Sequence, residues 1–221
     1  MIIVDLYLDL VSLIIGCLVV RRSWPFAFRC LFLVNILKVF NSYASFIWST
    51  TTHTSNHWML NLFFPLQCAG LLLVFYKSSI HPVVIRIDGW LLAVLPVVIG
   101  VSWARGAPLD IINIGATVAC DFLLLLVACA ALIDQLLRTD DVRFTRQPLF
   151  WLASGLFFYS VGFIIFFTTF EYSKKMIMWG LFKSIYFFSG YLLNVGIIGC
   201  FICLYLKKIS KEPETDLRQP V

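Results

Sequence analysis

Charged side chains are scarce in this sequence. Only 13% of its 221 residues are Asp, Glu, Lys or Arg, and 61% are hydrophobic, whereas a soluble domain carries about 25% charged residues. A surface with so few charges cannot face water over most of its area, so we expect lipid to cover it. The composition excludes an ordinary soluble enzyme, and the net charge of +5 needs no nucleic acid to explain it.

Residues that carry catalytic or metal chemistry are also few. The chain has three His and lacks a nucleophile elbow, a phosphate-binding loop and a metalloprotease motif. His53 and His57 have a spacing that would suit a metal on one helical face, but the stretch 50–56 is typical of a loop and offers no third ligand. We therefore expect a protein that is not a stand-alone enzyme and that holds no metal or cofactor.

Cysteine does not indicate a disulfide framework. All seven cysteines fall within apolar segments, where a thiol is a small packing residue. Cys200 and Cys203 form a C-x-x-C pair, but in an apolar helix this spacing indicates one shared face and not a redox centre.

What the sequence has in abundance is long apolar runs. Seven of them are long enough, at about 1.5 Å per helical residue, to cross about 30 Å of hydrocarbon. Proline lies between or beside several of the runs, at Pro25, Pro82, Pro108 and Pro148. The predicted fold is an all-α bundle of seven transmembrane helices over residues 1–206, followed by a short cytoplasmic tail at 207–221. The predicted helices are 2–20, 26–48, 58–76, 87–103, 109–137, 149–170 and 178–206.

The distribution of Lys and Arg predicts the direction of the chain. One side of the predicted membrane holds only Arg105, Lys174 and Lys175. Because positive residues gather on the cytoplasmic side, we expect the N-terminus outside the cell and the C-terminus in the cytoplasm. The opposite, cytoplasmic side holds Arg21, Arg22, Lys77, Arg86, Arg138, Arg143, Arg146, Lys207, Lys208, Lys211 and Arg218.

Two similar segments leave open whether the chain contains an internal repeat. Residues 22–26 and 146–150 both place an Arg and a Pro before an apolar helix. They would fit a parallel repeat of two three-helix bundles joined by the fourth helix. The alternative is that basic residues and proline commonly begin the cytoplasmic ends of helices.

Several polar side chains lie at membrane depth, where they are costly and are candidates for function. Most of them fall in the outer half, which would form an outward-facing polar pocket for a small ligand or ion. The alternative is that these groups only pair with one another and lock the bundle. Asn194 lies deeper on the last helix. The candidate ligand-binding residues are Asp9, Lys38, Asn41, Asn61, Gln67, Asn113, Asp121 and Lys183.

The signs of these charges predict a pair. Asp9 and Lys38 both lie roughly 12–15 Å below the predicted outer surface on neighbouring helices. Each needs an opposite charge in a low dielectric, so we expect them to face each other. We also expect Asp121 and Lys183 nearby, with the whole group lining the pocket.

Two stretches resemble a known family. Residues 147–156, read as QPLFWLASGL, resemble the "P-x-F-W-I-x-x-G-L" start of the sixth helix in a largely uncharacterised family of small bacterial inner-membrane proteins. Residues 56–61, read as NHWMLN, resemble the start of that family's third helix. The family pattern has a Glu where this chain has Gln67. Its genes often lie near those of sensor histidine kinases, which implies a multi-pass protein of the inner (plasma) membrane with a signalling partner.

Three classes of function fit these observations. A receptor-like sensor would use the outward polar pocket and signal through a partner protein such as a histidine kinase. A small-solute or ion transporter would need a path through both halves of the membrane. A structural or assembly subunit of a membrane complex would need only the pairing of the polar groups.

The predicted topology is tested by the accessibility of introduced cysteines. Reporters placed near Ser55 and near Asp141 should react with a membrane-impermeant thiol reagent from opposite sides, because one position is predicted outside and the other in the cytoplasm. Labelling of both positions from the same side would contradict the topology.

Overall fold

The computed structural model describes residues 2–20, 24–104, 112–137, 146–173 and 179–209, and this part of the chain contains helices and no strand. The prediction of an all-α fold is therefore confirmed. The helices are α1 (Ile2–Val19), α2 (Phe26–Thr52), α3 (His57–Ser78), α4 (Pro82–Ala104), α5 (Ile114–Leu136), α6 (Pro148–Ser173) and α7 (Trp179–Ile209).

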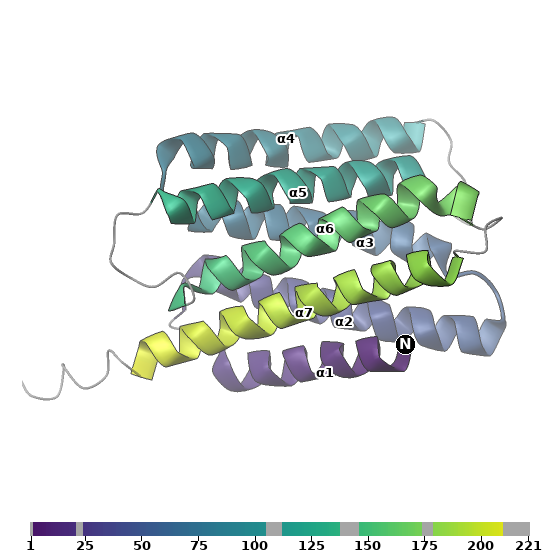
Figure 1. Ribbon diagram of the computed structural model, residues 1–221, viewed down its shortest axis with the longest axis horizontal. Coiled ribbons are helices and arrows are strands. Elements are labelled where there is room, and N and C mark those ends of the chain that lie inside the picture. The colour runs from purple at the N-terminus through teal and green to yellow at the C-terminus, as the bar shows by residue number, and fades with distance from the viewer. Residues whose placement is uncertain (1, 21–23, 105–111, 138–145, 174–178, 210–221) are drawn as a thin grey trace, which may run out of the picture.

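The helices run side by side along the length of the molecule (Figure 1). α1 packs against α2 and α7, α6 packs against α5 and α7, and α3 contacts α2, α4 and α5. Six helices therefore form a ring in the order α1, α2, α3, α5, α6, α7, and α4 lies outside it against α3 and α5. The internal repeat stays a prediction.

Each end of the bundle takes its name from a connection between two helices that lies there. The α2–α3 end, on the right in Figure 1, also holds the start of α1 and the start of α7. The α3–α4 end, on the left, also holds the end of α1, the start of α2 and the end of α7. The sequence predicts the α2–α3 end to be outside the cell.

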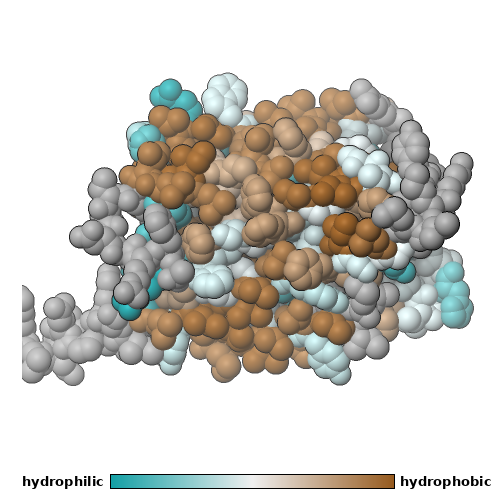
Figure 2. Space-filling model, in the orientation of Figure 1, coloured by the Kyte–Doolittle hydropathy of each residue, from teal (hydrophilic) through white to brown (hydrophobic). Residues whose placement is uncertain are grey.

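The surface is that of a membrane protein. Six helices, α2 to α7, are long and apolar enough to cross a bilayer. In α1 the apolar stretch Leu6–Val19 is shorter. Figure 2 shows hydrophobic residues over much of one face, with the most hydrophilic ones toward the two ends. These features indicate a multi-pass membrane protein.

α2 is longer than predicted, because it continues to Thr52 where the sequence predicted an end at residue 48. Thr51 and Thr52 donate hydrogen bonds from their hydroxyls to the carbonyls of Ile47 and Trp48, each at 2.8 Å. A threonine that bonds to the preceding turn satisfies its own hydroxyl within the helix, so these polar residues extend α2 and do not end it.

α4 and α5 also begin at residues other than those predicted. α4 starts at Pro82 and not at residue 87, since proline fits the first helical turn. The Asp134 carboxylate accepts the backbone N–H of His81 at 2.8 Å just before it. α5 starts at Ile114, and Asn113 caps it by accepting the N–H of Ala116 at 3.1 Å. The predicted start at 109–111 lies outside the described residues.

The remaining bounds differ by a few residues. α1 ends one residue earlier than predicted, whereas α3 and α6 extend slightly at both ends. α7 continues to Ile209, so residues 207–209, which were predicted as tail, belong to the helix. Residues 210–221 and the predicted start of the last helix at 178 lie outside the described residues.

Large apolar side chains fill the interior toward the α3–α4 end. Leu31, Leu72, Phe75, Leu152 and Phe201 are essentially inaccessible to solvent and belong to one hydrophobic cluster. They come from α2, α3, α6 and α7, so side chains of all four helices pack together in this half. This half of the bundle is tightly packed, as protein interiors generally are.

Two glycines let α6 and α7 approach at backbone distance. A Cβ added to Gly196 would lie 2.6 Å from the carbonyl oxygen of Trp151 and 3.0 Å from the Cα of Gly155. A Cβ added to Gly155 would lie 2.8 Å from the carbonyl oxygen of Leu192. Small residues that bring two backbones together are typical of packed membrane helices.

The glycine contact gives a stability prediction. Gly196→Ala should lower the free energy of unfolding by about 1–3 kcal/mol, because the new methyl group meets backbone that cannot move aside. Thermal unfolding in detergent measures this. Gly100→Ala on α4 is the matched control, since an added Cβ there meets nothing within 4 Å; it should leave stability equal or slightly higher. Equal melting temperatures for wild type and Gly196→Ala would contradict the packing.

Candidate functional site

The strongest polar feature is an ion pair that joins three helices. The Lys38 ammonium on α2 donates to Asp9 Oδ1 on α1 and to Asn194 Oδ1 on α7 at 3.1 Å. Asn194 Nδ2 also donates to Asp9 Oδ1 at 2.9 Å. Asp9 and Asn194 are fully buried, and the Lys38 side chain is 11% exposed. The predicted pairing of Asp9 with Lys38 is confirmed.

Two further residues extend this polar cluster, which comprises Asp9, Ser12, Asn35, Lys38 and Asn194. The Ser12 hydroxyl lies 2.8 Å from the Asp9 carbonyl oxygen and 3.1 Å from Asn35 Oδ1. Both residues are fully buried. The sequence prediction missed them, although a helical spacing of three residues separates Ser12 from Asp9 and Asn35 from Lys38 and places each pair on one face.

A cavity of about 100 Å³ lies beside the polar cluster, inside the helix ring. We call it the Lys38 cavity. Three of the predicted ligand-binding residues line it: Lys38, Asn41 and Gln67. Its other lining residues are Ser42, Leu60, Phe64, Tyr159, Phe163, Tyr186, Phe187 and Gly190.

Aromatic rings build the wall of this cavity on the side of α6 and α7. The Phe163 ring centroid lies 4.1 Å from that of Tyr159 and 4.6 Å from that of Tyr186. Phe64 on α3 stacks on Phe163 with centroids 6.4 Å apart and an angle of 5° between the planes. These contacts fix the shape of the cavity, because packed aromatic pairs prefer defined geometries.

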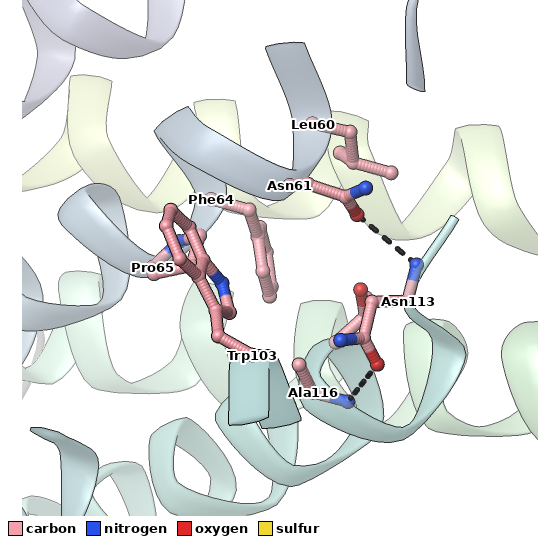
Figure 3. Close-up of a pocket in the computed structure, with 8 residues that line it drawn as sticks. Leu60, Asn61, Phe64, Pro65, Trp103, Asn113 and Ala116 are labelled. Atoms are coloured by element: carbon pink, nitrogen blue, oxygen red, sulfur yellow. Dashed lines mark hydrogen bonds between the residues drawn. The ribbon is translucent and has the colours of Figure 1, made fainter. Parts of the chain in front are cut away.

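A second cavity of about 140 Å³ lies between α3, α4 and α5 toward the α2–α3 end. Leu60 and Phe64 line both cavities and separate them. Figure 3 shows Asn61 and Asn113 facing each other across this space: the Asn113 backbone N–H donates to Asn61 Oδ1 at 3.0 Å. Asn113 also donates from Nδ2 to Ser102 at 2.7 Å. These bonds join the three helix ends, so we assign both amides a structural role.

Asp121 and Lys183 do not join the Asp9–Lys38 pair, and this part of the predicted grouping is wrong. Asp121 on α5 is fully buried, and neither of its carboxylate oxygens has a hydrogen-bond partner among the described residues. Lys183 on α7 is exposed, and neither residue lines the Lys38 cavity. Asp121 and Lys183 therefore lie in different environments, which their depth in the membrane and the sign of their charge did not predict.

Histidine does not form a metal centre in the described part of the chain. His53 ends α2 with a positive φ of 52°, and His57 begins α3, so the two rings do not share one helix face. Within the described ranges no group of three or more His, Cys, Asp or Glu residues is placed to hold a metal ion.

No family model, curated protein or solved structure matches the chain. The resemblance carried by residues 56–61 and 147–156 therefore stays a prediction.

The buried ion pair predicts non-additive effects on stability. Asp9→Asn and Lys38→Met should each lower the free energy of unfolding by about 3–5 kcal/mol, because each strands a buried partner. The double variant should lose less than the sum of the two. Thermal unfolding in detergent gives all three values.

Lys183→Met is the control for removing a lysine charge from a membrane helix. Because Lys183 is exposed, its loss should change stability by no more than about 0.5 kcal/mol. If the effects of Asp9→Asn and Lys38→Met simply add, the two side chains do not depend on each other.

Proposed function

We propose that this chain is a seven-span protein of the inner (plasma) membrane with a receptor-like, sensory role. It receives a small ligand or ion in the Lys38 cavity and passes the change to a partner protein. The partner carries the output, for which a histidine kinase is our candidate. The α2–α3 end faces outward and the end of α7 faces the cytoplasm, in keeping with the distribution of Lys and Arg.

α1 serves as the seventh span in this proposal. Its 18 residues reach about 27 Å, close to the thickness of the hydrocarbon. Asp5 and Asp9 lower the hydropathy of this helix, but Asp9 is neutralised by Lys38 and turned away from lipid. α1 also lies along α2 and α7, which supports its insertion with them.

The observation that carries the proposal is the contrast between the two halves of the ring. The cavities lined by Lys38, Gln67 and Asn61 lie toward the α2–α3 half. The interior of the other half is occupied mainly by apolar side chains such as Leu31, Phe75 and Phe201. A bundle with polar cavities in one half and packed apolar side chains in the other is suited to sensing a solute and not to carrying it across.

The size of the cavities limits the ligand. Sites for drug-sized ligands occupy about 300–1,000 Å³, whereas the Lys38 cavity and its neighbour measure about 100 and 140 Å³. They offer room for an ion, a few waters or a molecule of a few heavy atoms. We therefore expect a small inorganic or organic solute.

α7 is the element that transmits the signal in this proposal. It is the longest helix, with 31 residues. It contributes Tyr186, Phe187 and Gly190 to the cavity and Asn194 to the polar cluster. A ligand that changes the contact between Asn194 and Lys38 would change how α7 packs against α1 and α2. The C-terminal end of α7 would then present this change to the partner.

One observation favours transport as a second candidate function. Asp121 is a buried carboxyl group on a membrane helix without a hydrogen-bond partner among the described residues, and such groups mark ion paths in many transporters. For transport the packed half would have to open.

Two introduced cysteines distinguish the candidates in proteoliposomes of a chain that lacks its seven native cysteines. Ser42→Cys, in the Lys38 cavity, should react with an impermeant thiol reagent from the α2–α3 side, because in this proposal the polar half admits the ligand from that side. Leu72→Cys, in the packed half, should react from neither side. Reaction of Leu72→Cys from the α3–α4 side would reveal a passage and favour the transporter.

Co-purification tests the signalling role itself. In mild detergent the protein should retain a partner with an output domain, and Asp9→Asn should change the amount retained, since it loosens α1 from α7. Lys183→Met is again the control. A protein that purifies alone and mediates solute flux would overturn the sensory role.

A further inference from the structure

Gln67 on α3 is a buried residue that lines the Lys38 cavity. It is 7% exposed. A glutamine side chain carries one carbonyl acceptor and two N–H donors. Gln67 can therefore offer a hydrogen bond to a molecule or ion in the cavity.

Lys38 supplies a further donor to the same space. An ammonium group has three N–H donors, and those of Lys38 meet two acceptors among the described residues, Asp9 Oδ1 and Asn194 Oδ1. One N–H remains for the cavity. Asn41 adds its amide nitrogen, because its oxygen is the atom that accepts a bond from Ser45 at 3.4 Å.

The charge of the cavity wall favours an anion. Among its lining residues Lys38 is positive and no Asp or Glu is present, while Asp9 lies fully buried behind Lys38. A cation would meet the Lys38 ammonium, and like charges repel strongly in a low dielectric. A large or multiply charged anion is excluded by the volume of about 100 Å³ and by the cost of stripping its water.

We propose that the Lys38 cavity binds a small monovalent anion, held by Lys38, Gln67 and Asn41. This inference rests on the proposed function and names the class of its ligand. The bound anion accepts the N–H of Lys38 that Asp9 and Asn194 leave free, so it draws the ammonium toward the cavity and weakens the link between α2 and α1. Anions that lose water easily, such as nitrate or bromide, bind more tightly than fluoride, because the site is desolvated.

Thermal unfolding of the purified full chain in detergent tests the site. Sodium nitrate, bromide, chloride and formate are titrated at constant ionic strength against sodium gluconate, whose anion is too large for the cavity. At about thirty times its Kd, a binding anion should raise the melting temperature by about 4–8 °C relative to gluconate, and above Kd the rise should grow with the logarithm of the anion concentration. Gluconate alone should give no such rise.

Two matched variants separate binding from a general salt effect. Gln67→Leu should weaken the response at least about tenfold in Kd, because it removes one donor to the ion. Gln135→Leu should respond like wild type; this glutamine is 1% exposed and makes no side-chain hydrogen bond with the described residues, but lies on α5 in the packed half. If Gln67→Leu does not fold, Asn41→Leu takes its place.

The outcomes separate the two proposals. A rise over gluconate in wild type and Gln135→Leu that is reduced in Gln67→Leu or Asn41→Leu supports the anion site. The absence of a rise over gluconate for every anion, or an equal rise in Gln67→Leu and wild type, overturns it. If anion binding fails while Ser42→Cys and Leu72→Cys label as expected, the ligand class is wrong and the sensory role stands.

Discussion

Lys38 carries a positive charge into a helix that apolar side chains surround, and the way the bundle accommodates that charge determines the arrangement of α1, α2 and α7. Removing an ammonium group from water costs several kcal/mol unless an opposite charge and further hydrogen bonds replace the solvent. Asp9 supplies the charge and Asn194 the second acceptor. The three helices can therefore meet in only one register, because a shift along any of them would strand one of these groups.

The pairing also explains why the first and last helices are neighbours. Apolar helices gain little from contact with one another in lipid, since the lipid is equally apolar. A hydrogen-bonded triad gives α1 and α7 a specific reason to adjoin, and it closes the ring of six helices. The small polar cavity belongs to the same arrangement, because Lys38 lines it together with other polar residues.

The fold was largely predictable from the sequence, whereas the site was predictable only in part. Long apolar runs mark membrane helices whatever their neighbours, and Asp9 and Lys38 could be paired from depth and sign alone. The sequence did not show which side of each helix faces the interior. The interior and the lipid are both apolar, so the helices show little amphipathic pattern. This is why Lys183 proved exposed and Asp121 lacks a partner among the described residues. Helix ends shifted where local bonds decided them, as at Thr52 and Asn113.

The contact between Gly155 and Gly196 has a consequence for how this sequence can diverge. Each position faces backbone at less than 3.0 Å from an added Cβ, so every other amino acid is too large for it. Lipid-facing positions of α4, such as Val97 and Val101, accept any apolar side chain of ordinary size. Distant descendants of this chain should therefore keep both glycines while the lipid-facing positions of α4 change almost freely, and an alignment scored by overall identity would underestimate how closely such proteins share a structure.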